Sequence, residues 1–179
     1  MLSILDRMKL MLHELLLMHP GLPGDMIDYA RFGGLALQRS GHESPVRTEI
    51  DHEGAAGVAD VEWSLQDLAL LKVMDANRIT EDGAEALALA YLNTSASWVV
   101  ERRMRRGEHA DWLLRKPGHG LALEVSGTID GNERTRLNEK KQQIGRCRLP
   151  VERLAIVVAF GRPLILAGKP DEPRTGKID

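Results

Sequence analysis

Residues 107–128 read GEHADWLLRKPGHGLALEVSGT, and this stretch decides the fold. Its centre, Lys116-Pro117-Gly118-His119, is a turn signal between two runs in which apolar and polar residues alternate. The runs 110–115 and 121–126 therefore predict two antiparallel strands of a hairpin. The predicted apolar face carries Trp112, Leu114, Leu121, Leu123 and Val125.

Two acidic residues share the other face of this hairpin. A turn centred between Pro117 and Gly118 places Asp111 directly opposite Glu124. Two carboxylates about 4 Å apart repel by about 4 kcal/mol at an effective dielectric near 20, and a divalent cation is the simplest compensation. A turn shifted by one residue would instead point the carboxylates apart into solvent, and the pattern leaves both alternatives open.

The sequence around the hairpin predicts alternating helices and strands. Thr80 is a candidate N-cap, and the apolar stripe after it predicts a helix to about Ser95. Strand, hairpin, polar helix and buried strand follow, at residues 98–104, 110–126, 132–146 and 154–160. The polar helix has only Leu137 and Ile144 as aliphatic anchors, with Lys140 and Lys141 between them, so at least one lysine should face the sheet. The fold class expected from this order is α/β.

The first 75 residues predict a helical and hairpin extension. Helical spacing over residues 2–18 ends at Pro20-Gly21, and its Met-rich apolar side either packs in the core or binds a protein partner or a second copy. A short helix over 25–41, a hairpin of 46–51 with 57–63, and a helix from Ser64 to about Met74 follow. We therefore expect an extension over 1–75, a core over 76–167 and a disordered tail over 168–179.

Composition excludes several classes of protein. The 179 residues contain 43% hydrophobic and 28% charged residues, which is an ordinary globular balance. Cys147 is the only cysteine, so an internal disulfide is excluded and a small packed residue in a reducing compartment is expected. The sequence predicts no membrane-spanning segment and no signal peptide, which favours a cytoplasmic location. Walker A, HExxH, GxGxxG and GxSxG motifs are absent from the sequence.

The net charge of −2 hides a split along the chain. Residues 42–97 carry three basic and eleven acidic residues, whereas residues 98–146 carry eleven basic and seven acidic ones. The basic part includes Arg103, Arg105 and Arg106 at the end of a predicted strand, where they could bind phosphates or remain a solvated turn. An acidic half beside a basic half suggests two surfaces with different partners.

The order helix, three-strand meander, helix, strand resembles the core of the PD-(D/E)XK nuclease superfamily, which has the restriction-endonuclease-like fold. The residues that carry this resemblance are Gly107-x3-Asp111, then twelve residues, then Glu124-Val125-Ser126. The motif normally has lysine where this chain has Ser126, and a proline before the aspartate where it has Ala110. The resemblance spans residues 79–160.

This resemblance implies metal-dependent hydrolysis of phosphodiester bonds in DNA, in a setting such as genome defence or repair. Asp111, Glu124 and the Val125 carbonyl would hold Mg²⁺, with Mn²⁺ as a substitute. Lys140, or Lys141 as its alternate, would take the role of the motif lysine that Ser126 replaces. Glu81 or Glu85 on the preceding helix could reach a metal-bound water. The alternative is a catalytically inactive nuclease-fold protein that binds protein or nucleic acid.

Overall fold

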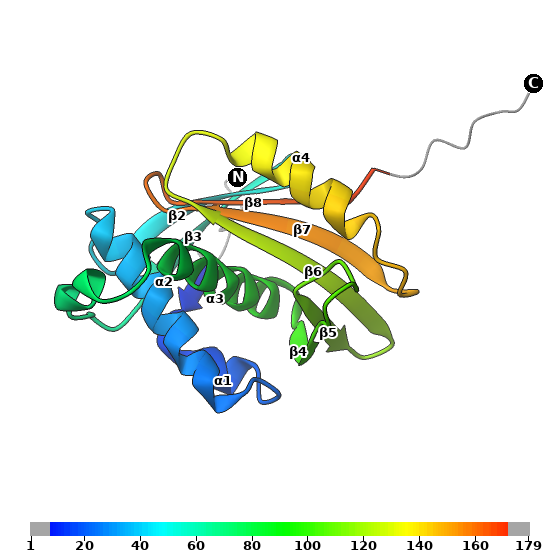
Figure 1. Ribbon diagram of the computed structural model, residues 1–179, viewed down its shortest axis with the longest axis horizontal. Coiled ribbons are helices and arrows are strands. Elements are labelled where there is room, and N and C mark those ends of the chain that lie inside the picture. The colour runs from blue at the N-terminus through cyan, green and yellow to red at the C-terminus, as the bar shows by residue number, and fades with distance from the viewer. Residues whose placement is uncertain (1–7, 172–179) are drawn as a thin grey trace, which may run out of the picture.

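The structure is a computed structural model that describes residues 8–171. Its strands are β1 (Met8–Met11), β2 (Val46–His52), β3 (Ala55–Glu62), β4 (Val99–Arg103), β5 (Trp112–Lys116), β6 (His119–Thr128), β7 (Glu152–Ala159) and β8 (Leu164–Gly168). They form one mixed sheet in the order β1-β3-β2-β8-β7-β6-β5-β4 (Figure 1). The expected α/β class is therefore confirmed.

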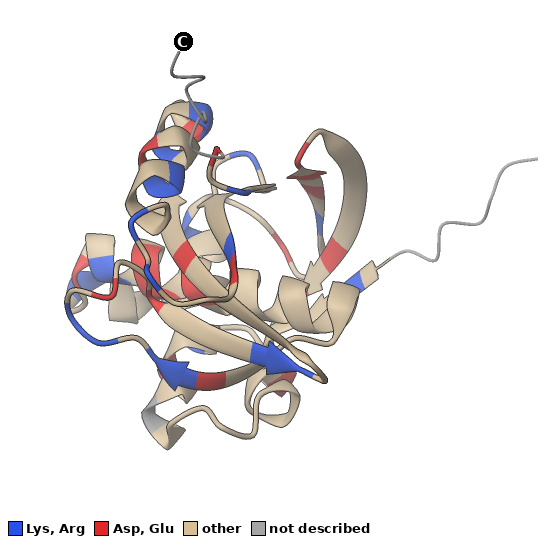
Figure 2. Cartoon of the chain, turned by 90° about the vertical axis from the view of Figure 1, so that its right-hand side faces the viewer, with Lys and Arg blue, Asp and Glu red and all other residues tan. Residues whose placement is uncertain are grey.

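Helices cover both faces of this sheet (Figure 1). Their bounds are α1 (Leu15–Met18), α2 (Ile27–Arg39), α3 (Ala76–Ala96) and α4 (Glu133–Ile144), with 3₁₀ turns at Leu12–Glu14, Gly24–Met26 and Leu68–Lys72. Helices α2 and α3 lie on one face and α4 lies alone on the other. Charged residues run along α4 (Figure 2), which buries only Leu137 and Ile144 as predicted.

The central hairpin has the predicted register. Trp112 pairs with Leu123 and Lys116 pairs with His119, as a turn at Pro117-Gly118 requires. The alternating pattern also assigns the faces correctly. Trp112 and Leu123 are fully buried in the larger core under α3, whereas Leu113 and Ala122 belong to a smaller core under α4. By the same alternation, Asp111 and Glu124 belong to the face of the sheet that α4 covers.

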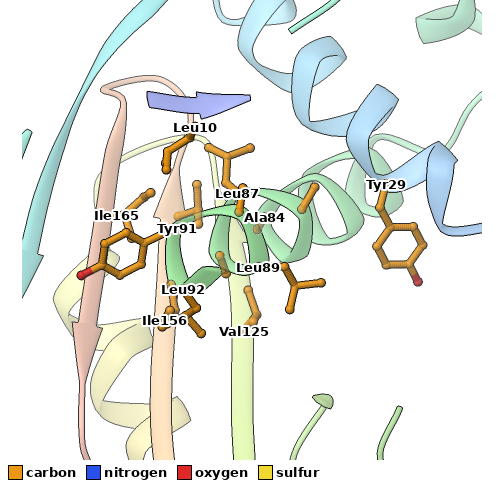
Figure 3. Close-up of a cluster of buried hydrophobic side chains, with 14 of the residues drawn as sticks. Leu10, Tyr29, Ala84, Leu87, Leu89, Tyr91, Leu92, Val125, Ile156 and Ile165 are labelled. Atoms are coloured by element: carbon orange, nitrogen blue, oxygen red, sulfur yellow. The ribbon is translucent and has the colours of Figure 1, made fainter. Parts of the chain in front are cut away.

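Helix α3 forms the centre of the larger core (Figure 3). Leu87 and Leu92 are almost completely buried, in the same cluster as Val125 of β6 and Ile156 of β7. Two glycines allow the close approach of α3 to its neighbours. A Cβ at Gly83 would lie 2.9 Å from the Phe32 carbonyl oxygen of α2, and one at Gly127 would lie 2.3 Å from that of Thr80.

The helix predicted over residues 2–18 is wrong for Met8–Met11 and is confirmed as an α-helix only in its last turn, Leu15–Met18. Residues 1–7 lie outside the described part of the chain, and Met8–Met11 form strand β1, which pairs in parallel with β3. A helix of one turn, α1, follows the 3₁₀ turn. The open edge of β3 outweighs helical spacing, since it gives this backbone hydrogen-bond partners. Leu10, Leu12 and Leu15 are buried, which confirms core packing for this side of the segment, whereas Leu17 is exposed.

Two more local predictions are wrong. Helix α3 begins at Ala76 rather than near Thr80, because the Asp75 carboxylate accepts a hydrogen bond from the Arg78 backbone N–H and caps the helix there. The helix predicted from Ser64 to Met74 shrinks to the 3₁₀ turn Leu68–Lys72, which buries no side chain. Because Leu70 and Leu71 are only partly buried, so short a segment has little to stabilise a full helix.

Strand β8 was not anticipated from the sequence, although Leu164–Gly168 is an apolar run. It lies between β7 and β2, antiparallel to the first and parallel to the second. Through this strand the β2–β3 hairpin, which is confirmed, joins the same sheet as the hairpin β5–β6. The predicted tail begins one residue early, because Gly168 ends β8; residues 172–179 lie outside the described part.

Between residues 8 and 171, no helix is long and apolar enough to span a bilayer.

Candidate active site

Asp111 and Glu124 line one open pocket of about 440 Å³ at the edge of the α4 face. Arg103 at the end of β4 and the turn residues Arg105 and Arg106 line the same pocket. The structure thus brings the predicted carboxylate pair and the predicted arginine group together. The remaining lining residues are Met104, Gly107, His109, Ala110 and Gln143.

The two carboxylates differ in how they are held. Asp111 lies just before β5, and its Oδ2 accepts a hydrogen bond of 2.8 Å from the Val125 backbone N–H. Glu124 lies within β6, where its Oε1 accepts a bond of 2.6 Å from Lys140 Nζ. The second oxygen of Glu124, Oε2, is buried and has no hydrogen-bond partner among residues 8–171. A buried carboxylate oxygen without a partner is costly, so it marks a place where a ligand would bind.

Burial favours the protonated forms of both acids. Burial, and then the charge of Asp111, raises the pKa of Glu124 to about 7, against the lowering effect of Lys140. Burial likewise raises the pKa of Asp111, although the hydrogen bond from Val125 and the charge of Lys140 oppose it. Glu124 therefore exchanges its proton near neutral pH, a property common at functional sites.

Oxygen atoms of this kind suit a hard divalent cation. The side chains of Asp111 and Glu124 both line the pocket, and Oε2 of Glu124 has no hydrogen-bond donor among residues 8–171. Val125 enters the site through its backbone N–H, and a metal contact from its carbonyl stays a prediction. No group of three or more His, Cys, Asp or Glu side chains able to hold a metal occurs within residues 8–171. Any cation here would keep several water ligands.

Only one of the two candidate lysines reaches the carboxylates. Lys140 projects from α4 toward β6 and bonds Glu124. Lys141 bonds Asp171, just beyond β8, at 2.8 Å. This outcome follows from helix geometry, since neighbouring residues point about 100° apart and cannot share one face.

Ser126 of β6, two residues after Glu124, and Glu81 of α3 form a second polar cluster. The Glu81 carboxylate accepts hydrogen bonds from Ser126 Oγ at 3.4 Å and from the Gly127 backbone N–H at 2.8 Å. Arg136 of α4 donates to Ser126 Oγ at 3.1 Å and lies 3.7 Å from Glu81. Glu81 is near enough that its charge raises the pKa of Glu124. A guanidinium from α4 therefore binds the Ser126 hydroxyl and lies close to the Glu81 carboxylate.

Glu85 of α3, the alternative to Glu81 in the sequence analysis, binds Arg103, which lines the pocket. It accepts a hydrogen bond of 2.7 Å from the Trp112 indole and bonds of 3.0 and 3.1 Å from Arg103. Arg103 also donates to the Tyr29 hydroxyl at 2.8 Å, and its guanidinium lies 4.8 Å from the Trp112 ring centroid. Burial, and then the charge of Asp111, raises the pKa of Glu85 to about 8.

The turn that follows Arg103 is braced by an ion pair. Glu108 accepts two hydrogen bonds of 2.9 Å from Arg102 and a third from the Arg105 backbone N–H. These bonds lower the pKa of Glu108 to about 2, so its charge stays balanced by Arg102. Arg105 and Arg106 are exposed, and neither forms an ion pair with any residue between 8 and 171. They are therefore available to an anionic ligand.

Two parts of the site were not predicted from the sequence. Arg136 has a detectable signal, because it lies four residues before Lys140 and so shares its helix face. The Glu85–Arg103–Trp112 contact has no such signal, because its residues come from three different elements. Trp112, which the hairpin pattern assigns to the apolar face, is buried, and so is Trp98.

Comparisons of the chain with protein-family models, curated proteins and solved structures find no match. The functional interpretation therefore depends on the chemistry of the site itself.

Proposed function

We propose that this protein is a Mg²⁺-dependent nuclease that hydrolyses phosphodiester bonds of DNA, in a setting such as genome defence or repair. One observation carries the proposal: Glu124, whose buried Oε2 has no hydrogen-bond donor among residues 8–171, lines the same pocket as Asp111, Arg103, Arg105 and Arg106. The order α3-β4-β5-β6-α4-β7 supports it, since the PD-(D/E)XK core has the same sequence of elements.

The carboxylates would bind the metal, with Mn²⁺ as a substitute. Asp111 and Glu124 supply the side-chain oxygens, and the Val125 carbonyl is a further candidate ligand. A bound divalent ion polarises the phosphate and lowers the pKa of a coordinated water. The protein keeps both acids in place through the Val125 N–H and the Lys140 ammonium.

Positive charge from α4 would stabilise the reacting phosphate. Lys140 and Arg136 share one face of the helix and reach Glu124 and Ser126, respectively. Their charges would offset the negative charge that develops as the phosphate is attacked. Arg103, held against Trp112, and the exposed Arg105 and Arg106 would bind flanking phosphates.

A cleavage assay tests this proposal directly. We expect wild-type protein to cut labelled single- or double-stranded DNA with Mg²⁺ or Mn²⁺ and to be inactive in EDTA. Asp111→Asn, Glu124→Gln and Lys140→Met should each lower the rate about 100-fold or more. Lys141→Met is the matched control, because Lys141 bonds Asp171, and it should keep wild-type activity. Equal cleavage by all variants, or none by the wild type, would contradict the proposal.

A second candidate function is nucleic-acid binding without catalysis. The observation that favours it is Ser126, whose hydroxyl bonds Arg136 and Glu81 at the position where the motif has lysine. DNA binding in the complete absence of metal-dependent cleavage would select this alternative.

A further inference from the structure

A second hollow, of about 590 Å³, adjoins the carboxylate pocket. Gly107 and His109 line both spaces, so the two meet along the 105–109 turn. On its other side this hollow is lined by Arg146, Arg148 and Leu149 from the connection between α4 and β7. A ligand in the carboxylate pocket could therefore extend directly onto this connection.

The α4–β7 connection holds its two arginines outward on a fixed backbone. Cys147, between them, is buried in the smaller core, whereas Arg146 and Arg148 are exposed. The Cys147 and Arg146 backbone N–H groups donate to Ile144 and Gln143 at 3.0 and 3.1 Å. Arg153 of β7 also braces the loop by donating to the Gly145 carbonyl at 3.0 Å.

The charge of this hollow is positive and is not balanced locally. Neither Arg146 nor Arg148 makes a side-chain hydrogen bond or an ion pair with any residue from 8 to 171. Glu108, the one acid that lines the hollow, is already bound to Arg102. With Arg105 and Arg106, the unpaired cations extend across both hollows instead of converging on one point. Such a spread suits a chain of phosphates better than a single phosphate group.

We propose that the α4–β7 connection is a second phosphate-binding subsite, at which Arg146 and Arg148 hold a polynucleotide strand that continues from the carboxylate pocket past the 105–109 turn. This inference rests on the proposed function and specifies its substrate as a polymer that spans both hollows. The two arginines contact backbone phosphates and read no bases, so they increase affinity without sequence preference.

The test is the salt dependence of DNA binding by the full chain. Binding of a fluorescein-labelled 20-base-pair duplex is measured in EDTA, where metal-dependent cleavage cannot occur, over a series of salt concentrations. Arg146→Ala/Arg148→Ala should weaken binding by the same factor for unrelated sequences. It should also reduce the slope of log Kd against log salt by about 2, about one unit for each lost phosphate contact.

Two control variants make the outcome specific. Arg146→Lys/Arg148→Lys keeps both charges and should keep the slope. Arg31→Ala/Arg78→Ala removes two exposed charges from α2 and α3, on the opposite face of the sheet, and should leave the slope unchanged. The subsite is refuted if the 146/148 alanine variant binds like the wild type, or if both alanine variants lose affinity equally.

The same variants separate this inference from the proposed function. If the Arg146→Ala/Arg148→Ala variant cleaves and binds DNA as the wild type does, the subsite is overturned and the proposed nuclease activity is retained. DNA binding that depends on Arg146 and Arg148 in a chain that cuts nothing supports the subsite and overturns the nuclease.

Discussion

At the scale of single residues, two buried glutamates, Glu85 of α3 and Glu124 of β6, have different roles. Both oxygens of Glu85 have partners, which are Arg103 and the Trp112 indole. Glu124 has one oxygen bonded to Lys140 and one with no partner among residues 8–171. A fully partnered acid supports its surroundings, whereas a half-partnered one is ready to bind a ligand.

Divalent metal should raise the melting temperature of the protein, and more so at higher pH. Burial and Asp111 raise the pKa of Glu124 to about 7, and a cation binds only the ionised pair. At a metal concentration of about 100 Kd, the stabilisation near pH 8 should be about 2.7 kcal/mol, or 5 °C or more, and it should shrink toward pH 5.5. Differential scanning fluorimetry with Mg²⁺ or Mn²⁺ measures it.

Glu124→Gln and Asp111→Asn should abolish this metal-induced shift. Glu85→Gln should preserve it, because both oxygens of Glu85 are already occupied. An unchanged shift in Asp111→Asn would place the metal elsewhere.

Glu85 should make the protein less stable as the pH rises. Burial raises its pKa from 4.5 to about 8, so between these values the unfolded chain has released a proton that the folded chain retains. The free energy of unfolding then falls with pH, by at most about 1.4 kcal/mol per unit for this group. Urea denaturation from pH 5 to 8.5 should give a flatter dependence for Glu85→Gln than for wild type. Parallel curves would show that Glu85 titrates normally.

At the scale of elements, the site depends on how closely α3 and α4 approach β6. Helix α4 positions Lys140 and Arg136, and α3 positions Glu81 and Glu85 from the other side. The approach of α3 is set by Gly127, where a side chain would collide with the backbone of Thr80. Backbone at this distance has no flexible end that could move away.

Gly127→Ala should therefore destabilise the fold by about 1–3 kcal/mol and displace Glu81 from the Gly127 backbone N–H. Gly24→Ala is the matched control, because a Cβ there meets no heavy atom within 4 Å. It should change stability by no more than about 0.5 kcal/mol. Urea denaturation compares the two variants, and equal stabilities would disprove the tight contact.

At the scale of the whole molecule, β8 joins the strands β1–β3 of the first 75 residues to the strands that carry the site. It pairs with β2 on one side and β7 on the other, and Leu10 of β1 belongs to the same core cluster as Leu87 of α3. The β1-β3-β2 strands and the site-bearing strands thus share both a sheet and a core. Disturbing either part should disturb the other.

We expect one cooperative unfolding transition for the full chain. Differential scanning calorimetry should give equal calorimetric and van't Hoff enthalpies. Ile165→Ala, in the fully buried centre of β8, should lower stability by about 2–5 kcal/mol and keep the transition single. Two separated transitions would mean that residues 1–75 and 76–167 unfold independently.

Several features of the fold could be predicted from the sequence because their causes are local. The turn at Pro117-Gly118 sets the hairpin register, and a side-chain period of two then puts Glu124 on the α4 face. Helical spacing between Leu137 and Ile144 likewise requires that one lysine face the sheet. These predictions succeed because each depends on residues only a few positions apart.

Tertiary structure alone decided the rest. Met8–Met11 has helical spacing but forms a strand, because the edge of β3 offers it hydrogen bonds. The spacing of residues could not predict which partners Glu85 of α3 would bind, since those partners come from β4 and β5. Nor could it place Arg146 and Arg148 beside Gly107, about forty positions earlier. Contacts of this length depend on the packing of the complete sheet, in which the free energy of many distant residues outweighs any local preference.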